Sequence, residues 1–341
     1  MSKKPDFTHL HVHTEFSLLD GMSKIDALMD ETKALGMDSI AITDHGALYG
    51  TVQFVQAATK RGIKPIIGVE TYVARRGMGD KEGKADQQPF HLVLLATNAV
   101  GYRNLCRLVT DAHLDGMYYK PRIDLDHLAK YSEGLIGLSG CLNGEIARAL
   151  EVDDWEHARA LAGRYGDIFG KDRFYLEVQD HGLPEQKRLN EQLFKLAPEV
   201  GLPLVLTNDL HYVRAQQREA HDVLLCIGTE SNLETPGRMR FNSGEFYLKS
   251  PAQMAALFPD RPDLLLNTRA ISEAVDFKLT LGQPRMPDVE VPKGETVESW
   301  LRKEAERGLL RRYGTPSAAA RERLEYELGV ILKMGYGAYF L

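Results

Sequence analysis

The chain has 341 residues, of which 43% are hydrophobic and 26% are charged, a balance that excludes wholesale disorder. Its 48 acidic and 42 basic residues give a formal net charge of −6, so any contact with nucleic acid would have to be local. Three cysteines without C-x-x-C spacing exclude a disulfide framework and favour a cytoplasmic location. No segment approaches the roughly 18 apolar residues of a membrane span, and we expect no signal peptide.

Short apolar runs alternate with amphipathic stretches up to about residue 210. Runs rich in Val, Ile, Leu or aromatic residues predict seven strands, at 7–13, 39–43, 65–72, 90–96, 135–138, 174–178 and 204–207. Helical patterns lie between most of them, at 25–35, 52–60, 100–112, 155–169 and 184–197. The alternation predicts parallel βαβ units, and the number of strands favours an α/β barrel over an open sheet.

The character of the chain changes after about residue 280. Three prolines between 284 and 292 predict an extended linker, and helical patterns follow at 297–313 and 318–334. We therefore expect two domains, 1–280 and 281–341. The final run, GYGAYFL, is apolar, which predicts that the sequence is cut from a longer chain. The alternative is a C-terminal strand that packs into a sheet.

Histidine and acidic side chains gather where the predicted strands end. The first strand reads HLHVH, so His9, His11 and His13 share one face, and we expect His9 to lie deeper in the core. Further candidate ligands follow along the chain: Asp20, His45, Glu70, Cys141, Asp209 and His211. Because the carboxyl ends of parallel strands meet at one rim of a barrel, these side chains should converge there.

His91 begins its strand instead of ending it, but we expect it to point inward with Val93 and Leu95. Nine donors exceed one tetrahedral site and fit two or three ions bridged by a carboxylate. The mixture of nitrogen, oxygen and sulfur suits Zn²⁺, Mn²⁺ or Fe²⁺ better than Mg²⁺ or Ca²⁺. Clustered metals favour phosphoester hydrolysis by metal-bound hydroxide, although these arguments leave an amide-bond hydrolase open.

The order His11-x-His13, Asp20, Thr43-Asp44-His45, Glu70, His91, Cys141 and Asp209-x-His211 resembles the polymerase and histidinol phosphatase (PHP) domain. The strings HLHVHTEFSLLDG, AITDHGALYG, YYKPRID, SGCLNGEI and TNDLHY are similar to the version of this domain in bacterial DNA polymerase III alpha subunits. The string MGYGAYFL resembles the point where the palm domain of that family begins. The resemblance implies a distorted seven-stranded (β/α)7 TIM-like barrel, followed by the mostly helical start of a palm domain.

The resemblance also implies a trinuclear metal site. One ion would be held by His11, His13, Glu70 and Asp209, a second by His91, Cys141 and bridging Glu70, and a third by Asp20, His45 and His211. The implied activity is a metal-dependent 3′ to 5′ exonuclease that proofreads DNA, and we expect its catalytic residues to be Asp209, His211, Glu70 and His13. The catalytic aspartates of the polymerase belong to the palm and are absent, so this chain should not synthesise DNA.

The implied partners are the 3′ end of a DNA primer, the remainder of the alpha subunit, the separate proofreading exonuclease subunit and other replisome subunits. One alternative is a catalytically silent module, stabilised by metal, that docks the polymerase core or the proofreading subunit. A further alternative is a free-standing phosphatase for small phosphomonoesters.

Several polar side chains outside the ligand set are candidates for contacting substrate. Lys120 and Arg122 are candidates for binding a DNA phosphate, and Tyr118 and Tyr119 beside them for stacking on a base. Two residues that end a strand on the same rim, Glu177 and His181, are candidates either for supporting the ligands or for contacting substrate. In contrast, we expect His113 and His221 to be ordinary surface residues.

Overall fold

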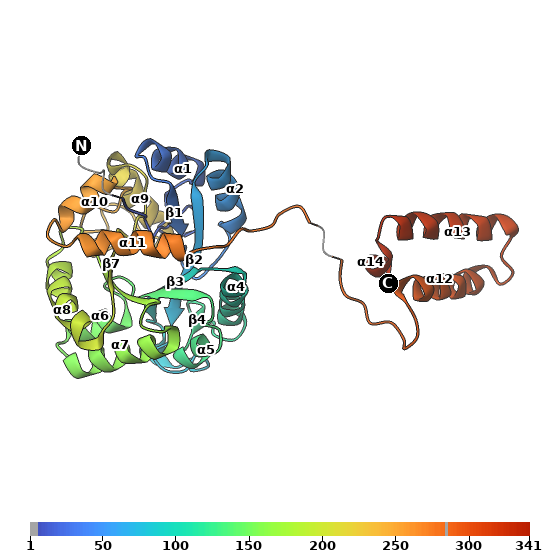
Figure 1. Ribbon diagram of the computed structural model, residues 1–341, viewed down its shortest axis with the longest axis horizontal. Coiled ribbons are helices and arrows are strands. Elements are labelled where there is room, and N and C mark those ends of the chain that lie inside the picture. The colour runs from blue at the N-terminus through green and yellow to red at the C-terminus, as the bar shows by residue number, and fades with distance from the viewer. Residues whose placement is uncertain (1–5, 284–285) are drawn as a thin grey trace. The chain divides into compact units, whose positions relative to one another are not determined.

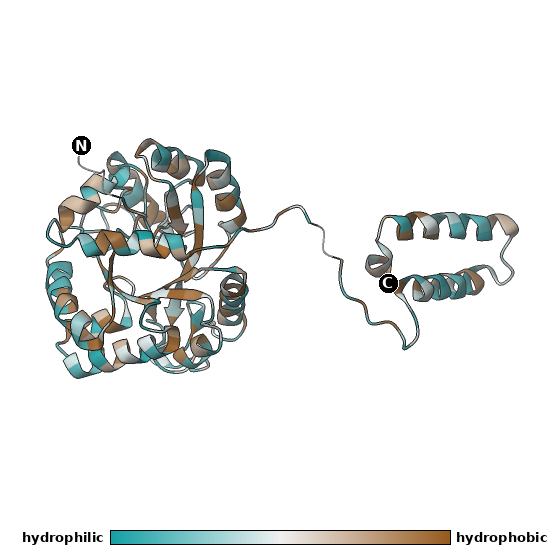
Figure 2. Cartoon of the chain, in the orientation of Figure 1, coloured by the Kyte–Doolittle hydropathy of each residue, from teal (hydrophilic) through white to brown (hydrophobic). Residues whose placement is uncertain are grey.

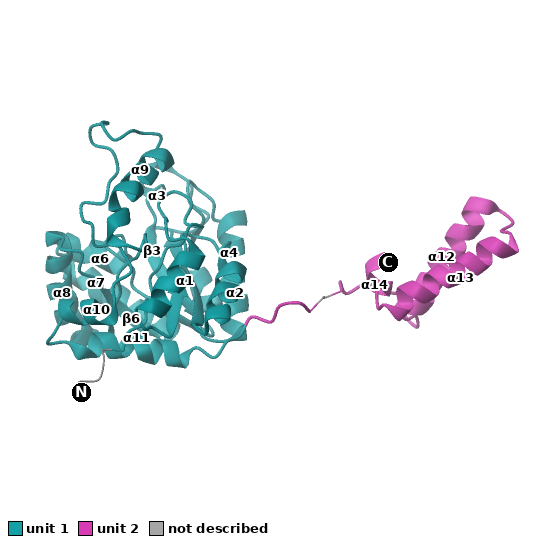
Figure 3. Cartoon of the chain, turned by 90° about the horizontal axis from the view of Figure 1, so that it is seen from above, with its two compact units in different colours: residues 1–278 teal, residues 279–341 magenta. Residues whose placement is uncertain are grey.

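The computed structural model describes residues 6–283 and 286–341, so Pro284 of the expected linker lies outside the described residues. The chain divides into two compact units, residues 1–278 and 279–341 (Figure 3). The division lies close to residue 280, where the sequence changes character. That the second unit begins a palm domain stays a prediction.

The first unit is built on one seven-stranded sheet, in the order β1-β2-β3-β5-β6-β7, with β4 paired to β2. The strands are β1 (Ser39–Ile42), β2 (Lys64–Val73), β3 (Phe90–Ala96), β4 (Arg122–Ile123), β5 (Leu135–Leu138), β6 (Phe174–Val178) and β7 (Leu204–Leu206). The six predicted strands between residues 39 and 207 are thereby confirmed in position. The two-residue strand β4 is too short to leave a pattern in the sequence.

The segment 7–13 closes the sheet into a distorted barrel without forming a regular strand. It makes isolated parallel bridges, from His9 to Ile40 of β1 and from Val12 to Leu210 just beyond β7. The His13 N–H donates to the Leu210 carbonyl over 2.8 Å, so the segment joins the two edges of the sheet. The segment thus pairs with β1 on one side and with the residue Leu210 beyond β7 on the other.

The prediction that all strands are parallel is wrong for β3. This strand runs antiparallel to both β2 and β5, whereas the pairs β1–β2, β5–β6 and β6–β7 are parallel. The connection from β2 to β3 contains only the four-residue helix α3 (Gly83–Asp86), which is too short for the crossover that a parallel pair needs. As a result, β3 begins at the end of the barrel where the neighbouring strands β2 and β5 finish.

Helices surround the strands on the outside of the barrel (Figure 1). Five of them lie where the sequence predicts: α1 (Ile25–Ala34), α2 (Thr51–Arg61), α4 (Ala99–Leu114), α7 (Trp155–Phe169) and α8 (Pro184–Val200). The sequence analysis did not predict α5 (Leu125–Lys130), α6 (Glu145–Glu151), η1 (Ala215–Gln217), α9 (Arg218–Gly228), α10 (Pro251–Leu257) or α11 (Pro262–Ala274). Hydrophobic residues lie mainly on the strands and on inward helix faces, and hydrophilic residues lie mainly outside (Figure 2).

Helix α11 closes one end of the barrel. Its Ile271, together with Val275 just beyond it, packs against the apolar side chains that fill the barrel, among them Leu95. The Asn267 side chain donates to the carbonyl of Leu204, the first residue of β7, over 2.7 Å. Helix α11 covers the end of the barrel at which the parallel strands begin. Polar side chains can therefore gather only at the opposite end.

The second unit consists of α12 (Val297–Tyr313), α13 (Ala318–Lys333) and α14 (Gly337–Phe340). The first two helices are confirmed, and they bury Leu301, Leu309 and Leu328. The alternative that residues 335–341 form a strand is wrong, because this stretch contains a single helical turn. Among the helices of the described residues, none has the length and apolar character needed to cross a membrane.

Candidate metal centre

The nine predicted ligands lie together at the end of the barrel opposite α11. They come from the turn after segment 7–13, from β2 and β3, from the ends of β1, β5 and β7, and from the segment itself. The set is His11, His13, Asp20, His45, Glu70, His91, Cys141, Asp209 and His211, and each member lies within 4.0 Å of another through its side-chain atoms. His91 belongs to the group because the reversal of β3 brings its first residues to this end.

Glu70 is the centre of the cluster. Its Oε1 lies 2.8 Å from His91 Nδ1 and 3.3 Å from His11 Nε2, and its Oε2 lies 2.6 Å from His45 Nδ1. Burial by itself would raise the pKa of Glu70, but the neighbouring His91 and His45 hold that pKa well below its usual range. Glu70 is therefore an ionised carboxylate with both oxygens in contact with imidazoles, as a bridging ligand would be.

Asp209 approaches the same cluster from the end of β7. Its Oδ1 lies 3.2 Å from His11 Nε2 and 3.1 Å from His13 Nε2. Its backbone has a φ of +42°, in the left-handed region that favours glycine, where a non-glycine residue costs on the order of 1 kcal/mol. The Asp209 carbonyl accepts a hydrogen bond from His211 Nδ1 over 2.7 Å. This tight turn directs both the Asp209 and the His211 side chain into the cluster.

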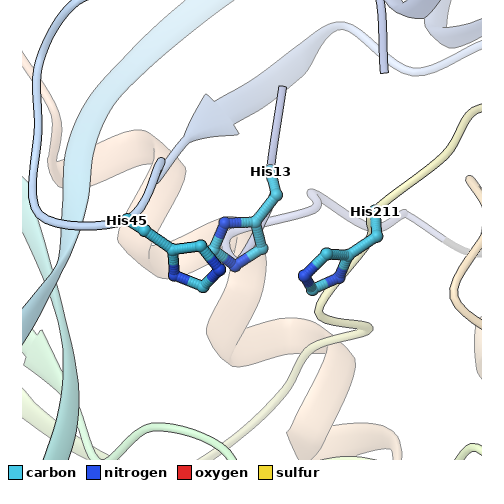
Figure 4. A group of neighbouring side chains, drawn as sticks. All are labelled: His13, His45 and His211. Carbon is cyan, nitrogen blue, oxygen red and sulfur yellow. The ribbon is translucent and has the colours of Figure 1, made fainter. Parts of the chain in front are cut away.

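Three imidazoles, those of His13, His45 and His211, form a second group (Figure 4). The ring of His13 lies 4.1 Å from that of His45 and 4.4 Å from that of His211, measured between centroids. Asp20 Oδ2 lies 3.1 Å from His45 Nε2 and 4.0 Å from His211 Nε2. Burial together with the neighbouring His45 and His211 lowers the pKa of His13 to about 3, so its ring is neutral and offers a lone pair.

Cys141 completes a third group with Glu70 and His91. Its Sγ lies 3.9 Å from His91 Nδ1, and one ligand atom from each of the three residues lies within 4.8 Å of the other two. Burial, reinforced by Asp209 and Glu70, raises the pKa of the Cys141 thiol well above its ordinary value. Without a nearby cation this thiol stays protonated, whereas a bound metal would stabilise the thiolate.

Buried polar atoms without hydrogen-bond partners show that the cluster suits cations. Such an atom costs about 1–3 kcal/mol if nothing compensates it. Six of them belong to this cluster: His11 Nε2, His13 Nε2, Asp20 Oδ1, His45 Nδ1, Glu70 Oε2 and Asp209 Oδ1. Several lie within 3.3 Å of one another without hydrogen-bond geometry, so their lone pairs converge. Imidazole, carboxylate and thiolate together fit Zn²⁺, Mn²⁺ or Fe²⁺.

Glu177 supports the cluster from behind, and the hypothesis that it contacts substrate is wrong. His11 Nδ1 donates to Glu177 Oε1 over 2.6 Å, and Glu177 Oε2 accepts from the Gly140 N–H over 3.0 Å. Thr207 donates to the same Oε1. With its carboxylate fully buried and occupied, Glu177 turns Nε2 of His11 towards the cluster. Carboxylates that orient ligating histidines in this way are common in metal sites.

His181 is likewise not a substrate contact. The side chain is 1% exposed, its Nε2 donates to the Asn208 carbonyl over 2.8 Å, and its ring stacks on Phe246 at 3.9 Å. Burial lowers the pKa of His181 to about 4, so the ring is neutral. It fixes the backbone immediately before Asp209.

The expectation that Arg122 binds a DNA phosphate is wrong. Arg122 is fully buried, and its guanidinium donates to four backbone carbonyls, those of Asp80, Met78, Asp86 and Gly116, over 2.8–3.1 Å. Three of these carbonyls belong to the 77–88 segment, where little regular structure is present to pair them. The arginine thus provides hydrogen-bond donors for backbone carbonyls of this segment that no regular structure pairs.

Lys120 and Tyr118 remain candidates for contacting substrate. Lys120 lines the cavity of about 400 Å³ into which the metal cluster opens, with its Nζ 5.3 Å from the centroid of the Tyr72 ring. Tyr118 is half-buried, and the Arg122 guanidinium lies 5.3 Å from its ring centroid. Tyr119 is the more exposed of the two tyrosines, at 71%.

Two histidines that the sequence analysis took for surface residues hold the backbone next to ligands. His221 on α9 is buried, and its Nε2 donates to the carbonyl of Asp20 over 2.7 Å. His113 on α4 lines the cavity, and its Nε2 donates to the carbonyl of Gly46 over 2.9 Å. Both lie on helices, where no local pattern marks a link to a distant loop.

The chain is similar in sequence to proteins of known family. Residues 9–181 match the PHP domain family. DNA polymerase III subunit alpha of Treponema pallidum (strain Nichols) is 42% identical over 337 residues, which cover 98% of this chain and 29% of the relative. The same subunit of Thermus aquaticus is 45% identical over 323 residues, which cover 92% of this chain and 26% of the relative. The chain thus spans less than a third of the length of these relatives.

One solved structure that resembles the chain is distant from it in sequence. Histidinol phosphate phosphatase from Lactococcus lactis, determined with zinc, L-histidinol and phosphate, has a TM-score of 0.36 and 14% identity. The match covers 72% of this chain and 99% of the phosphatase.

Proposed function

The chain belongs to the PHP domain family, and on that premise we propose that it is a metal-dependent phosphoesterase that removes nucleotides from the 3′ end of DNA. The observation that carries the proposal is the convergence of nine potential ligands around Glu70, with buried lone pairs that lack partners. Supporting the choice of DNA is the similarity of nearly the whole chain to DNA polymerase III alpha subunits.

The ligands divide into three groups, of which the first two share Glu70. His11, His13, Glu70 and Asp209 would hold one ion, Glu70, His91 and Cys141 a second, and Asp20, His45 and His211 a third. Bound divalent ions would make a nearby water more acidic and would stabilise negative charge on the phosphate.

The chain's own side chains hold the ligands in place and bind the substrate. Glu70 links the groups through its two oxygens, and Glu177 keeps His11 turned towards the cluster. Lys120 lies at the edge of the cavity, where its ammonium would hold a phosphate oxygen of the substrate. We propose Asp209, His211, Glu70 and His13 as the catalytic residues, because they surround the point where the three groups meet.

A 3′-mismatched primer tests this function. The full chain is loaded with Mn²⁺ or Zn²⁺, its metal content is measured, and release of nucleotides from the labelled primer is followed. We expect mononucleotides to appear from the 3′ end and cleavage to stop with a chelator. A fully loaded protein that releases no nucleotide would contradict the proposal.

A structural role for the metals is the second candidate, and the way the barrel closes favours it. Segment 7–13 pairs with the sheet through isolated bridges and not as a regular strand, and it carries His11 and His13, which lie beside Glu70 of β2 and Asp209 beyond β7. Ions held by these residues would tie the closing segment to both sides of the sheet. In that case the docked partners would be the remainder of the alpha subunit or a separate proofreading subunit.

Chelation separates the two candidates. A structural role predicts a large drop in melting temperature on removal of metal, whether or not the protein cleaves DNA. Loss of cleavage with an unchanged melting temperature would leave only the enzymatic role.

A further inference from the structure

A groove continues from the metal cavity across the surface of the first unit. Its volume is about 700 Å³, against about 400 Å³ for the metal cavity, and the two share Tyr72, His91, Lys120 and Asn143. The groove runs past residues 87–90 towards α6 and the start of α7. A small phosphomonoester would fill only the first space, so the continuous depression offers room for further units attached to the reacting phosphate.

A strained turn precedes Lys120, which lines both spaces, whereas Tyr119 itself lies outside their lining. The Tyr118 N–H donates to the Lys120 carbonyl over 3.1 Å, so the chain reverses at Tyr119. Tyr119 has a φ of +59° and is 71% exposed. A bulky residue in the left-handed region is strained, and an exposed ring gains nothing from burial to offset that strain. A backbone outlier of this kind beside a functional cavity indicates a role in binding.

Two basic side chains line the groove without an ion pair among the described residues. Lys120 lies over the Tyr72 ring, and Arg75 lies over the Phe90 ring with its guanidinium carbon 4.3 Å from the centroid. Arg75 Nε donates to the Gln88 carbonyl over 2.6 Å, which fixes the guanidinium and leaves its two terminal nitrogens for a ligand. Guanidinium and ammonium groups held in this way suit phosphate oxygens.

The acidic side chains that line the groove already have partners. Glu151 accepts from Arg148 over 2.6 Å, Asp154 accepts from the backbone N–H of His157, and Glu145 accepts from the Tyr165 hydroxyl over 2.9 Å. Burial raises the pKa of Glu145. Three basic and three acidic side chains line the groove, so its formal charge is balanced, and the cations left without a carboxylate partner among the described residues are Arg75 and Lys120.

We propose that the 118–120 turn and this groove bind an unpaired strand of nucleic acid, with Tyr119 stacked on a base and with Lys120 and Arg75 on backbone phosphates. The inference rests on the proposed function and narrows it, because it assigns the metal centre to the end of a strand and not to a small phosphate ester. An exposed aromatic ring beside cationic groups is the usual means of holding single strands without regard to sequence. The groove holds the strand while its end lies at the metal cluster.

Binding is measured first, without metal, so that hydrolysis plays no part. Fluorescence anisotropy with a labelled single-stranded octanucleotide and a chelator compares the full chain with the variants Tyr119→Ala, Lys120→Gln and Arg75→Gln. We expect about a tenfold weaker Kd for Tyr119→Ala and for each loss of a cation, with a shallower salt dependence for the two cation variants. Matched controls are Arg103→Gln on α4 and Tyr313→Ala on α12, which should bind as the unchanged chain does. Equal Kd values for groove and control variants would overturn the inference, as would tighter binding of a blunt duplex.

Hydrolysis is measured second, with Mn²⁺, on single strands of two to ten nucleotides and on bis(p-nitrophenyl) phosphate, which has neither bases nor a backbone. The groove predicts that kcat/KM rises with strand length and that Arg75→Gln flattens this rise, whereas Arg103→Gln on α4 should leave cleavage of every substrate unchanged. Cleavage of all substrates without dependence on length or on Arg75 would overturn the inference and leave the proposed function standing. Strand binding that depends on Tyr119 and Arg75, with no cleavage of any substrate, would support the groove and overturn the proposed function.

Discussion

The two ends of the barrel differ in almost every physical respect, although the same strands reach both. At one end, Ile271 and Val275 pack on apolar side chains such as Leu95, and hydrogen bonds from α11 satisfy the starts of the strands. At the other end, nine titratable side chains meet with several buried atoms lacking partners. The apolar end stabilises the fold by itself, whereas the polar end is costly unless cations compensate it. Changes at the two ends should therefore have separable effects.

The largest effect is expected from Asp209→Ala at the polar end. Asp209 contacts His11 and His13, and its removal leaves their lone pairs without the carboxylate that balances an ion. We expect loss of at least one bound ion and a fall of about a thousandfold in cleavage, equivalent to about 4 kcal/mol of transition-state stabilisation. Elemental analysis and the primer assay measure the two quantities.

Two further variants make that result specific. Asp209→Asn keeps the size of the side chain, so it shows whether the loss follows from charge and not from misfolding. Asp167→Ala removes an exposed carboxylate from α7 and should leave metal content and cleavage unchanged. An Asp209→Ala protein with its full complement of ions would remove this carboxylate from the ligand set.

Leu95→Ala tests the apolar end. The side chain is fully buried within the barrel, and truncation of such a leucine costs about 2–5 kcal/mol of unfolding free energy. We expect a clear shift of the denaturation midpoint, with metal content per folded molecule unchanged. If this variant lost its ions at temperatures where it stays folded, the two ends would not be separable.

A smaller effect, on metal affinity, is expected from a change of Glu177, which orients the ligand His11. In Glu177→Gln, the hydrogen bond from His11 Nδ1 to a charged carboxylate becomes one to a neutral amide. Loss of such supporting carboxylates typically weakens metal affinity by about 10- to 100-fold. Competition with a chromogenic chelator measures the affinity, and unchanged affinity would show that His11 needs no orientation by Glu177.

The pH dependence of stability tests a second supporting residue, His181. Burial lowers its pKa in the folded chain to about 4, below the ordinary value of 6.5, so the unfolded chain binds more protons between these values. The stabilisation from keeping the ring neutral is complete above pH 6.5 and is lost as the pH falls towards 4, by up to about 1.4 kcal/mol per pH unit.

Urea denaturation of the metal-free protein between pH 7.5 and 5 isolates this contribution. His181→Gln keeps a donor for the Asn208 carbonyl but does not titrate, so its unfolding free energy should fall less steeply. Parallel pH profiles for the two proteins would show that His181 is not held neutral by the fold.

Much of the barrel could be predicted from sequence because each strand has its own apolar run. The spacing of His11 and His13 and the position of Asp209 at a strand end were enough to bring these residues to one rim. The direction of β3 was not predictable in the same way, since it depends on what lies between two strands and not on either strand. For that reason His91 seemed misplaced, although its alternation with Val93 correctly indicated an inward side chain.

Residues whose roles depend on distant backbone were missed or misassigned. Arg122 lies close in sequence to Tyr118 and Tyr119, which suggested a phosphate contact, but three of its four carbonyl partners lie 36 to 44 residues away. His221 similarly reaches the carbonyl of Asp20, 201 residues earlier in the chain. Composition and periodicity describe only a residue's neighbours along the chain. They carry no information about the distant backbone carbonyls to which these two side chains donate.

The most direct measurement is anomalous X-ray diffraction from crystals of the full chain soaked in Mn²⁺ or Zn²⁺. The account predicts two or three anomalous peaks beside Glu70, each at a coordination distance of about 2.0–2.3 Å from several of the nine side chains. Peaks elsewhere on the surface only, with the cluster around Glu70 free of metal at saturating concentration, would contradict it.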